Sequence, residues 1–309
     1  MSGREIVTLG RLIAEPGLLD PPEPVVAPFA WSGRVTLLAA REKAGKSTLA
    51  SYVAARASDG REAFGHPVRY GPVLWVALEE HLGDLAGRLV SFDAEPDHIH
   101  ILHRLGENPL TDLRESADEV KPSLVVIDTL AAFTQALDLD PGNASAWTPV
   151  MSAITRTARD SGAGILLLHH GRKSDGKFRD SSAIGAGVDV ILEMDTGEGY
   201  SRKVDVRARW KVDNFEIHLL TDLSTGKPRG YELRESGDDP TERVWRFIQF
   251  NPGASKRTVR NGVPGQDHKV DDALEYLQAT GAIENRGSGN RHAYHCLKSP
   301  ATLSGHGAP

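Results

Sequence analysis

Short, wholly apolar runs separated by stretches with helical spacing constrain the fold of this chain more than any other feature. A strand with one solvated face alternates polar and apolar residues, whereas these runs are apolar throughout. Such strands are typical of a parallel sheet covered by helices on both faces, so we expect an α/β, doubly wound domain. The expected strands are 35–40, 73–78, 99–102, 124–127, 165–168 and 188–192, and the expected helices lie near 47–58, 82–91, 112–120 and 146–161.

Three later segments, 203–210, 215–220 and 229–234, alternate polar and apolar residues and predict an antiparallel extension of the sheet with one wet face. A proline-rich stretch, 16–28, predicts an extended lead-in, because proline lacks a donor and restricts its predecessor. We therefore expect an N-terminal extended segment at 1–28 and the α/β domain at 29–236.

After a Gly-Asp-Asp-Pro linker at 237–240 the pattern changes, and a small domain is expected at 241–297. Helical spacing at 241–250, 255–260 and 267–280 precedes a hairpin with a glycine-rich tip at 283–294. Three helices followed by a basic hairpin indicate a winged helix. We expect a disordered tail at 298–309.

Composition excludes several classes of protein. The 309 residues are 39% hydrophobic and 25% charged, as in ordinary globular proteins. No apolar run reaches the ~20 residues of a membrane helix, and residues 1–11 lack a signal core, so we expect a cytoplasmic protein. The single cysteine, Cys296, excludes a disulfide framework and a cysteine-based metal site.

The charge of the chain is uneven. A net charge of -6 argues against a nucleic-acid coat, but residues 241–296 carry eight Lys or Arg against six Asp or Glu. This mildly basic segment is compatible with local contact to DNA.

A phosphate-binding loop is predicted between the first strand and the first helix. The residues are Ala40, Arg41, Glu42, Lys43, Ala44, Gly45, Lys46, Ser47 and Thr48, a P-loop pattern in which alanine replaces the first glycine. Gly45 allows the backbone N–H groups to approach phosphates at the start of a helix. Lys46 suits the β- and γ-phosphates of ATP, and the Ser47 hydroxyl suits Mg²⁺. The alternative is an incidental turn, and Ala40 weakens the prediction if its position requires a positive φ.

Acidic residues end two further strands. Asp128 follows the apolar run 124–127, where ligands bind in open parallel sheets, and we assign it to Mg²⁺ together with Ser47. Glu79 and Glu80 follow the run 73–78, and we assign Glu79 to the attacking water, with Glu80 in reserve. The alternative for all three is a helix-capping role.

His169 and His170 end another strand. A metal site is rejected, because adjacent residues of a strand point to opposite faces and no third ligand is near. We assign His169 to a hydrogen bond with the γ-phosphate; a backbone-satisfied histidine is the alternative.

The loop that follows is basic, with Arg172, Lys173, Lys177 and Arg179 within a few residues. It either grips a phosphate backbone or is solvated surface.

Together these motifs resemble the RepA-type, RecA-like ATPases, the plasmid and phage replicative helicases that work as hexameric rings. The resemblance covers roughly residues 25–195. The motifs that carry it, in chain order, are the P-loop, Leu78-Glu79-Glu80 with Arg88, Val126-Ile127-Asp128-Thr129-Leu130, His169-His170 with Lys173, and Arg179-Asp180-Ser181-Ser182.

The resemblance implies a RecA-like P-loop NTPase core, ATP and Mg²⁺ as cofactors, single-stranded DNA as a partner and a homo-oligomeric ring. It implies that Glu79 is the catalytic carboxylate and that Arg179 reaches the γ-phosphate of a neighbouring subunit. Asp180 stands where the family has glycine, which would weaken the field of Arg179. It also implies a DNA-contacting role for the loop 171–179. The candidate DNA contacts are Arg88, Arg172, Lys173, Lys177, Lys256, Arg257, Arg260, Arg286 and Arg291. For Arg88, a role at the subunit interface is the alternative.

Three functions remain open at this point. The first is a motor that translocates on single-stranded DNA, a replicative helicase. The second is an ATP-regulated DNA-binding or replication-loading factor, in which the winged helix binds DNA or a replication protein. The third is a RecA-like ATPase of recombination or repair.

Overall fold

The computed structural model describes residues 6–15, 17–137, 144–171, 182–195, 200–221, 227–235, 240–263, 267–288 and 291–297. The chain divides into two compact units. The first comprises Met1–Thr196, Lys203–Asn214 and Leu219–Leu233, and the second comprises Gly197–Arg202, Phe215–His218 and Arg234–Pro309.

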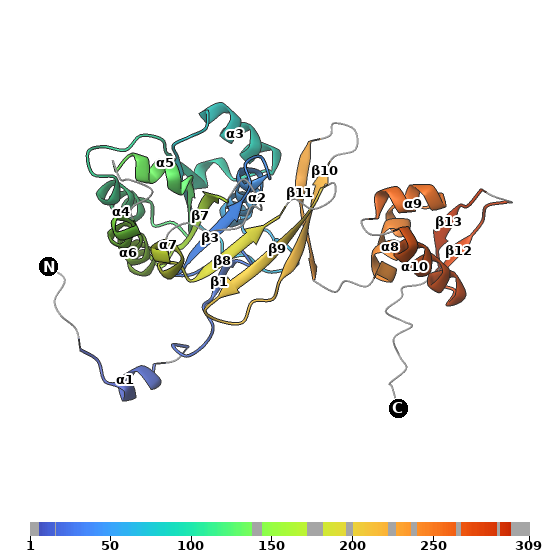
Figure 1. Ribbon diagram of the computed structural model, residues 1–309, viewed down its shortest axis with the longest axis horizontal. Coiled ribbons are helices and arrows are strands. Elements are labelled where there is room, and N and C mark those ends of the chain that lie inside the picture. Colours follow the sequence, from blue (N-terminus) through green and yellow to red (C-terminus); the bar gives the residue numbers. More distant parts are fainter. Residues whose placement is uncertain are drawn as a thin grey trace. The chain divides into compact units, whose positions relative to one another are not determined.

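A nine-stranded sheet organises the longer part of the chain, with the spatial order β11-β10-β9-β8-β3-β7-β6-β4-β5 (Figure 1). Strands β8, β3, β7, β6, β4 and β5 pair in parallel, neighbour with neighbour. This arrangement confirms the predicted α/β class. The parallel strands are β3 (Val35–Ala40), β4 (Val73–Ala77), β5 (Ile99–Leu102), β6 (Leu124–Asp128), β7 (Gly164–His170) and β8 (Val190–Met194).

The other three strands extend the sheet beyond β8. Strand β9 pairs with β8 in the antiparallel sense, and its burial alternates along the strand, as the sequence pattern predicts. These strands are β9 (Ser201–Ala208), β10 (Phe215–Thr221) and β11 (Pro228–Glu235).

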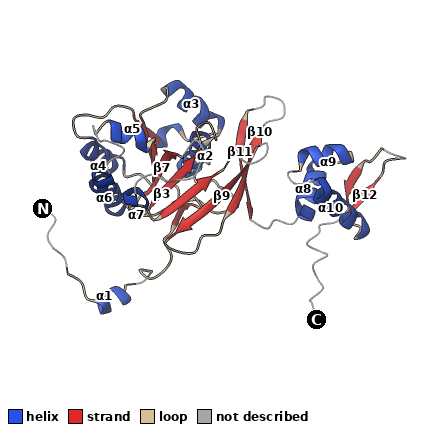
Figure 2. Cartoon of the chain, viewed as in Figure 1, coloured by secondary structure: helices blue, strands red, loops and turns tan. Residues whose placement is uncertain are grey.

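Helices cover both faces of the parallel strands (Figure 2). Every second residue of β3, β4, β6 and β7 joins one buried cluster with residues of α4, α5, α6 and α7. No residue of α2 belongs to that cluster, although α2 contacts the same strands, so α2 covers the opposite face together with α3. The helices are α2 (Lys46–Asp59), α3 (Leu82–Ser91), α4 (Pro109–Val120), α5 (Leu130–Gln135), α6 (Ala144–Ser161) and α7 (Ser182–Ala186), with a 3₁₀ turn at Pro96–His98.

The N-terminal segment departs from the extended lead-in expected from its prolines. A short helix, α1 (Leu9–Ile13), begins after Thr8, whose hydroxyl accepts a hydrogen bond from the backbone N–H of Arg11. Strand β1 (Pro24–Val26) pairs with β2 (Ala30–Trp31) in the antiparallel sense. The sequence analysis missed α1, α5 and α7, because five or six residues are too few to show a helical period.

The C-terminal segment has its own core, in which Val244, Ile248, Leu274, Leu277 and Tyr294 are buried. Its element order, three helices and then an antiparallel hairpin, is the order expected from sequence; its assignment as a winged helix stays a prediction. The elements are α8 (Pro240–Phe250), α9 (Lys256–Gly262), α10 (Asp267–Ala279), β12 (Ile283–Asn285) and β13 (Tyr294–Cys296). Across the described residues, no helix combines the length and apolarity needed to cross a membrane.

Candidate nucleotide-binding site

The candidate site lies at one edge of the sheet, where four neighbouring strands end. In the order β3-β7-β6-β4, these strands lead to the predicted P-loop, His170, Asp128 and Glu79. Because the strands are parallel, their carboxyl ends share one edge, the edge at which such sheets bind ligands. The backbone N–H of Leu78 donates to the carbonyl of Asp128 at 3.2 Å and joins two of these ends.

The P-loop meets its backbone requirements without a glycine at its entrance. Ala40 is the last residue of β3 and is absent from the residues with positive φ, so alanine is tolerated there. Gly45 caps α2 with φ of +96°, which suits glycine because it has no Cβ. Lys43 has φ of +60°, so the unfavourable left-handed conformation falls on Lys43 and not on Ala40.

Lys46 lies at the centre of the site, and only 5% of it is exposed. Its ammonium donates to the carbonyl oxygens of Ala40 and Arg41, each at 3.0 Å, and lies 3.3 Å from Nδ1 of His170. Burial lowers the pKa of Lys46, and the charge of Asp128 opposes that shift. The lysine is therefore a buried, partly desolvated cation, able to exchange loop carbonyls for phosphate oxygens.

Asp128 and Ser47 form the oxygen pair expected for a magnesium site. Asp128 is 4% exposed; burial raises its pKa to about 6, and a hydrogen bond with Ser47 partly offsets the shift. Glu80 and Glu79 raise it further through their charges. A hydroxyl beside a buried carboxylate suits Mg²⁺, which binds through one or two such groups plus phosphates and water. Within the described ranges, no group of three or more His, Cys, Asp or Glu could hold a metal ion alone.

The two glutamates after β4 have different surroundings. Both carboxylate oxygens of Glu80 accept from the guanidinium of Arg88 on α3, and its side chain is 18% exposed. The Glu79 side chain is 44% exposed and its carboxylate lies 3.7 Å from Nε2 of His170. Glu79 is thus open to water, whereas Glu80 is held in an ion pair. The same pair engages the guanidinium of Arg88, whose assignment as a DNA contact stays a prediction.

His170, not His169, faces the nucleotide end of the loop. His170 lies between Lys46 and Glu79, as the distances above show, and its side chain is 37% exposed. His169 is 5% exposed. Adjacent strand residues point to opposite faces, and Leu166, Leu168 and His170 share the face opposite the cluster that holds Ile165 and Leu167. The geometry therefore favours His170 for the phosphate-contacting role that the sequence analysis gave to His169.

The remaining candidate DNA contacts lie in the C-terminal segment or outside the described residues. Lys256 and Arg260 both pair with Asp271 of α10, and Arg286 pairs with Glu284, all within the C-terminal segment. Arg257 and Arg291 are exposed and have no ion pair within the described residues. Arg172, Lys173, Lys177 and Arg179 lie outside the described residues.

The parallel sheet and its strand-to-helix phosphate loop define a RecA-like P-loop NTPase core. A family model for an AAA domain, AAA_25, matches residues 10–176, and the chain belongs to this family.

Curated relatives include two proteins named DNA repair protein RadA. The protein from Mycolicibacterium smegmatis is 30% identical over 199 residues, which cover 60% of this chain and 40% of the relative. The protein from Halalkalibacterium halodurans is 24% identical over 206 residues, which cover 66% and 40%. The chain therefore matches less than half the length of these relatives.

A solved structure with a similar fold is the KaiC-like protein from the archaeon Pyrococcus horikoshii. It superposes with a TM-score of 0.52 at 17% identity and covers 69% of this chain and 99% of that protein. At this identity the likeness concerns the fold alone.

Proposed function

We propose that this protein hydrolyses ATP with Mg²⁺ and couples hydrolysis to single-stranded DNA. The observation that carries the proposal is the convergence of Lys46, the hydrogen-bonded pair Ser47–Asp128 and the open carboxylate of Glu79 at one edge of the sheet. These are the groups that phosphoryl transfer to water needs: a cation for the phosphates, oxygen ligands for the metal and a group that orients water.

Binding uses the loop and its lysine. The loop from Lys43 to Thr48, with Ala40 at its entrance, presents backbone N–H groups at the start of α2, where the helix dipole favours anions. Lys46 leaves the carbonyls of Ala40 and Arg41 and turns to the β- and γ-phosphates. Ser47 and Asp128 would hold Mg²⁺, which would supply positive charge beside the phosphate oxygens.

Glu79 activates the water that attacks the γ-phosphate. Its carboxylate orients a water in line with the γ-phosphorus and accepts its proton as the new P–O bond forms and the bond to the leaving oxygen of ADP breaks. The products are ADP, inorganic phosphate and a proton. His170 lies within reach of both Glu79 and Lys46, so it holds the glutamate near the phosphate end of the site.

More specifically, we propose that the protein is a RepA-type ring helicase, and substitution of Arg179 tests this proposal. The support is the order of motifs in the sequence, in which Arg179 matches the family's subunit-bridging arginine. We expect Arg179→Ala to lower turnover only in the assembled protein. Full-rate hydrolysis by a strictly monomeric protein would contradict the role of Arg179.

A second candidate is an ATPase of DNA repair. It is favoured by the name of the relatives, DNA repair protein RadA, although the chain matches only 40% of their length. Both candidates require the same pocket, so they differ in the DNA transaction and not in the chemistry.

The deciding experiment measures ATP turnover with and without single-stranded DNA, together with mass in solution in each state. We expect DNA to stimulate turnover and Lys46→Ala to abolish it. Slow turnover that DNA does not change, with binding to one duplex sequence through residues 241–296, would instead support an ATP-regulated DNA-binding or loading factor. Undetectable turnover in the wild type under both conditions would overturn the proposal.

A further inference from the structure

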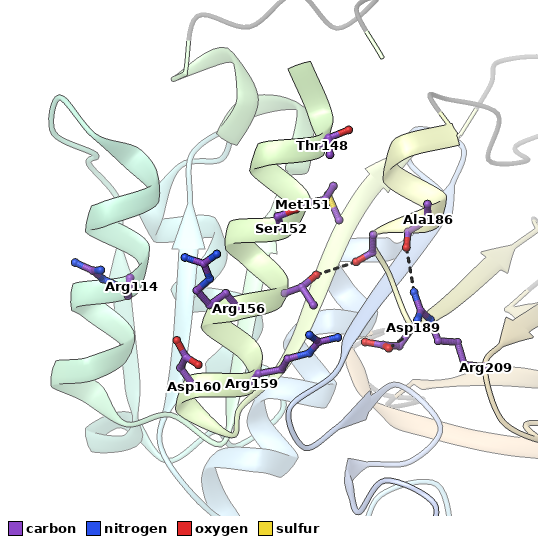
Figure 3. A pocket seen from close by; sticks show the side chains of 12 residues that line it. Arg114, Thr148, Met151, Ser152, Arg156, Arg159, Asp160, Ala186, Asp189 and Arg209 are labelled. Carbon is purple, nitrogen blue, oxygen red and sulfur yellow. Dashed lines mark hydrogen bonds and ion pairs between the residues drawn. The ribbon is translucent and has the colours of Figure 1, made fainter. Parts of the chain in front are cut away.

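A concave surface lies along helix α6, away from the phosphate loop. It is a groove of about 890 Å³ between α6, α4, α7 and the beginning of β8 (Figure 3). Asp189, which lines its floor, bonds through its backbone and side chain to Val35, the first residue of β3. The P-loop follows the last residue of β3, so this end of the groove lies at the opposite edge of the sheet.

Arginines dominate the lining of this groove. Arg156 and Arg159, one turn apart on α6, are exposed and have no ion pair within the described residues. Arg114 of α4 is 58% exposed, and its nearest carboxylate, Glu115, is 4.0 Å away. Arg209 donates to the carbonyl of Ala186 at 3.0 Å, which fixes its guanidinium at the groove wall (Figure 3).

The acidic residues of the lining do not cancel this charge. The carboxylate of Asp189 is 5% exposed and accepts from the backbone N–H of Val35 at 3.1 Å. Arg34 at 3.9 Å and Arg209 at 3.6 Å already face it. Asp160 is the remaining acid of the lining, against three further arginines. The groove is therefore a local positive surface on a chain whose net charge is -6.

We propose that this groove binds the phosphate backbone of a nucleic-acid strand. The proposal shares with the proposed function the premise that the protein acts on nucleic acid, but it needs neither ATP nor the P-loop. It adds residues of α6 to the DNA contacts that the sequence analysis predicted.

The polar residues of α6 that line the groove form a stripe along the helix, and the length of this stripe favours a chain of phosphates over a single anion. Thr148, Ser152, Arg156 and Arg159 recur every three or four residues and so share one face of α6. From Thr148 to Arg159 the stripe spans about 16 Å at 1.5 Å per residue. One phosphate group would use only one turn of it, whereas a strand can contact the whole length.

The donor types also favour nucleic acid over an acidic peptide. Arginine and hydroxyl side chains are the usual partners of phosphate oxygens in nucleic-acid complexes. Peptide-docking surfaces depend on aromatic or aliphatic anchors in apolar pockets. Among the described residues, the apolar side chains of the lining are Met151, which is 1% exposed, and Ala186.

The test uses the full chain, a fluorescein-labelled dT oligonucleotide, and no ATP or Mg²⁺. Affinity is measured over a series of salt concentrations for the wild type and for Arg156→Ala/Arg159→Ala. We expect the double variant to bind about tenfold more weakly and its salt slope to fall by about 1.4, since each lost phosphate contact on a single strand removes ~0.7. Basal ATP turnover should not change.

Matched variants make the result specific. Arg104→Ala removes one exposed arginine outside the groove and should leave the slope unchanged. Arg156→Lys/Arg159→Lys keeps both charges and should retain most of the slope. Lys46→Ala, which stops hydrolysis, should leave this binding intact, so failure of the ATPase proposal and of this one are distinguishable.

Two outcomes would overturn the proposal. One is an affinity and slope in Arg156→Ala/Arg159→Ala equal to those of the wild type. The other is a poly-glutamate peptide of matched charge that displaces the oligonucleotide from the wild type at equal concentration, which would show a surface for any polyanion.

Discussion

Two aspartates, Asp128 in the sheet and Asp271 in the C-terminal segment, have pKa values shifted in opposite directions. Burial raises the pKa of Asp128 to about 6. Hydrogen bonds from Arg260 and Lys256 lower the pKa of Asp271. The hydrogen bond with Ser47 and the charge of Arg88 lower the pKa of Asp128, but burial outweighs them, so its charge is poorly compensated and suits an incoming cation. Asp271 already has two cations at contact distance.

The difference separates residues arranged for chemistry from residues arranged for structure. A buried charge with little compensation is costly, and such groups concentrate at functional sites. A compensated pair at the surface contributes little and holds its cations away from other partners. The C-terminal segment thus has a basic composition, but Arg257 and Arg291 are its unpaired candidates among the described residues.

The largest expected effect falls on Glu79. Glu79→Gln keeps the shape of the side chain but removes the base, so we expect turnover to fall about 10²–10⁴-fold while nucleotide binding remains. The measurement is steady-state ATP hydrolysis beside equilibrium binding of a fluorescent ATP analogue.

Glu80→Gln is the matched control, because it removes an equal charge one residue away, where the carboxylate pairs with Arg88, and leaves the carboxylate of Glu79 in place. We expect a much smaller loss of turnover. If Glu80→Gln proves the more damaging variant, the roles of the two glutamates must be exchanged.

The second effect concerns the pH dependence conferred by Asp128. Because its folded pKa lies near 6 and its ordinary value is 3.8, the folded state holds the extra proton between these values. The contribution of Asp128 to the free energy of unfolding is therefore fully present below about pH 4. It is lost as the pH rises through about 6. In EDTA at pH 7.5, we expect Asp128→Asn to raise the free energy of unfolding by about 3 kcal/mol.

Urea unfolding at pH 4 and pH 7.5 checks this expectation, since the gain should shrink at the lower pH. A gain of the same size at both values would mean that the carboxylate charge is not its cause.

The third effect concerns Asp271, whose charge is compensated by Lys256 and Arg260. Asp271→Asn releases Lys256 and Arg260, so we expect duplex DNA to bind a few-fold more tightly, with a salt slope steeper by about 1. Arg257→Ala should weaken binding, whereas Lys256→Ala in the unaltered background should change it little. Fluorescence anisotropy across a salt series measures all three, and unchanged binding in Asp271→Asn would argue against α9 as a DNA contact.

The smallest effect concerns the backbone of the phosphate loop. Lys43→Gly removes the steric cost of the left-handed conformation at φ of +60° but raises the conformational entropy of the unfolded chain. We expect a net gain of about 0.5–1 kcal/mol in the free energy of unfolding. Lys43→Ala serves as the control, because it removes the charge and keeps the Cβ. An equal gain from both variants would point to charge, not backbone, as the cause.

Much of the fold could be predicted because the sheet is buried on both faces. Apolar runs identified β3, β4, β6, β7 and β8, and helical spacing identified α2, α3, α4 and α6. The short elements α1, α5 and α7 could not be predicted, because their helical period is not complete. The pairing of β1 with β2 was also not predicted, because the prolines at 16–28 were interpreted as an extended segment.

The sequence by itself determined which residue types stand at the strand ends: Gly45-Lys46-Ser47 after one strand, Asp128 at another, and Glu79-Glu80 after a third. Parallel strands place such residues at one edge whatever their order in the sheet. Only the tertiary structure decided which member of each adjacent pair lies near Lys46 or is open to water. The faces of β7 are assigned by where α2 packs, so His170 rather than His169 meets Lys46, and α3 brings Arg88 to Glu80, which leaves Glu79 open to water. The groove along α6 depends on packing in the same way, because its arginines come from three elements far apart in the chain.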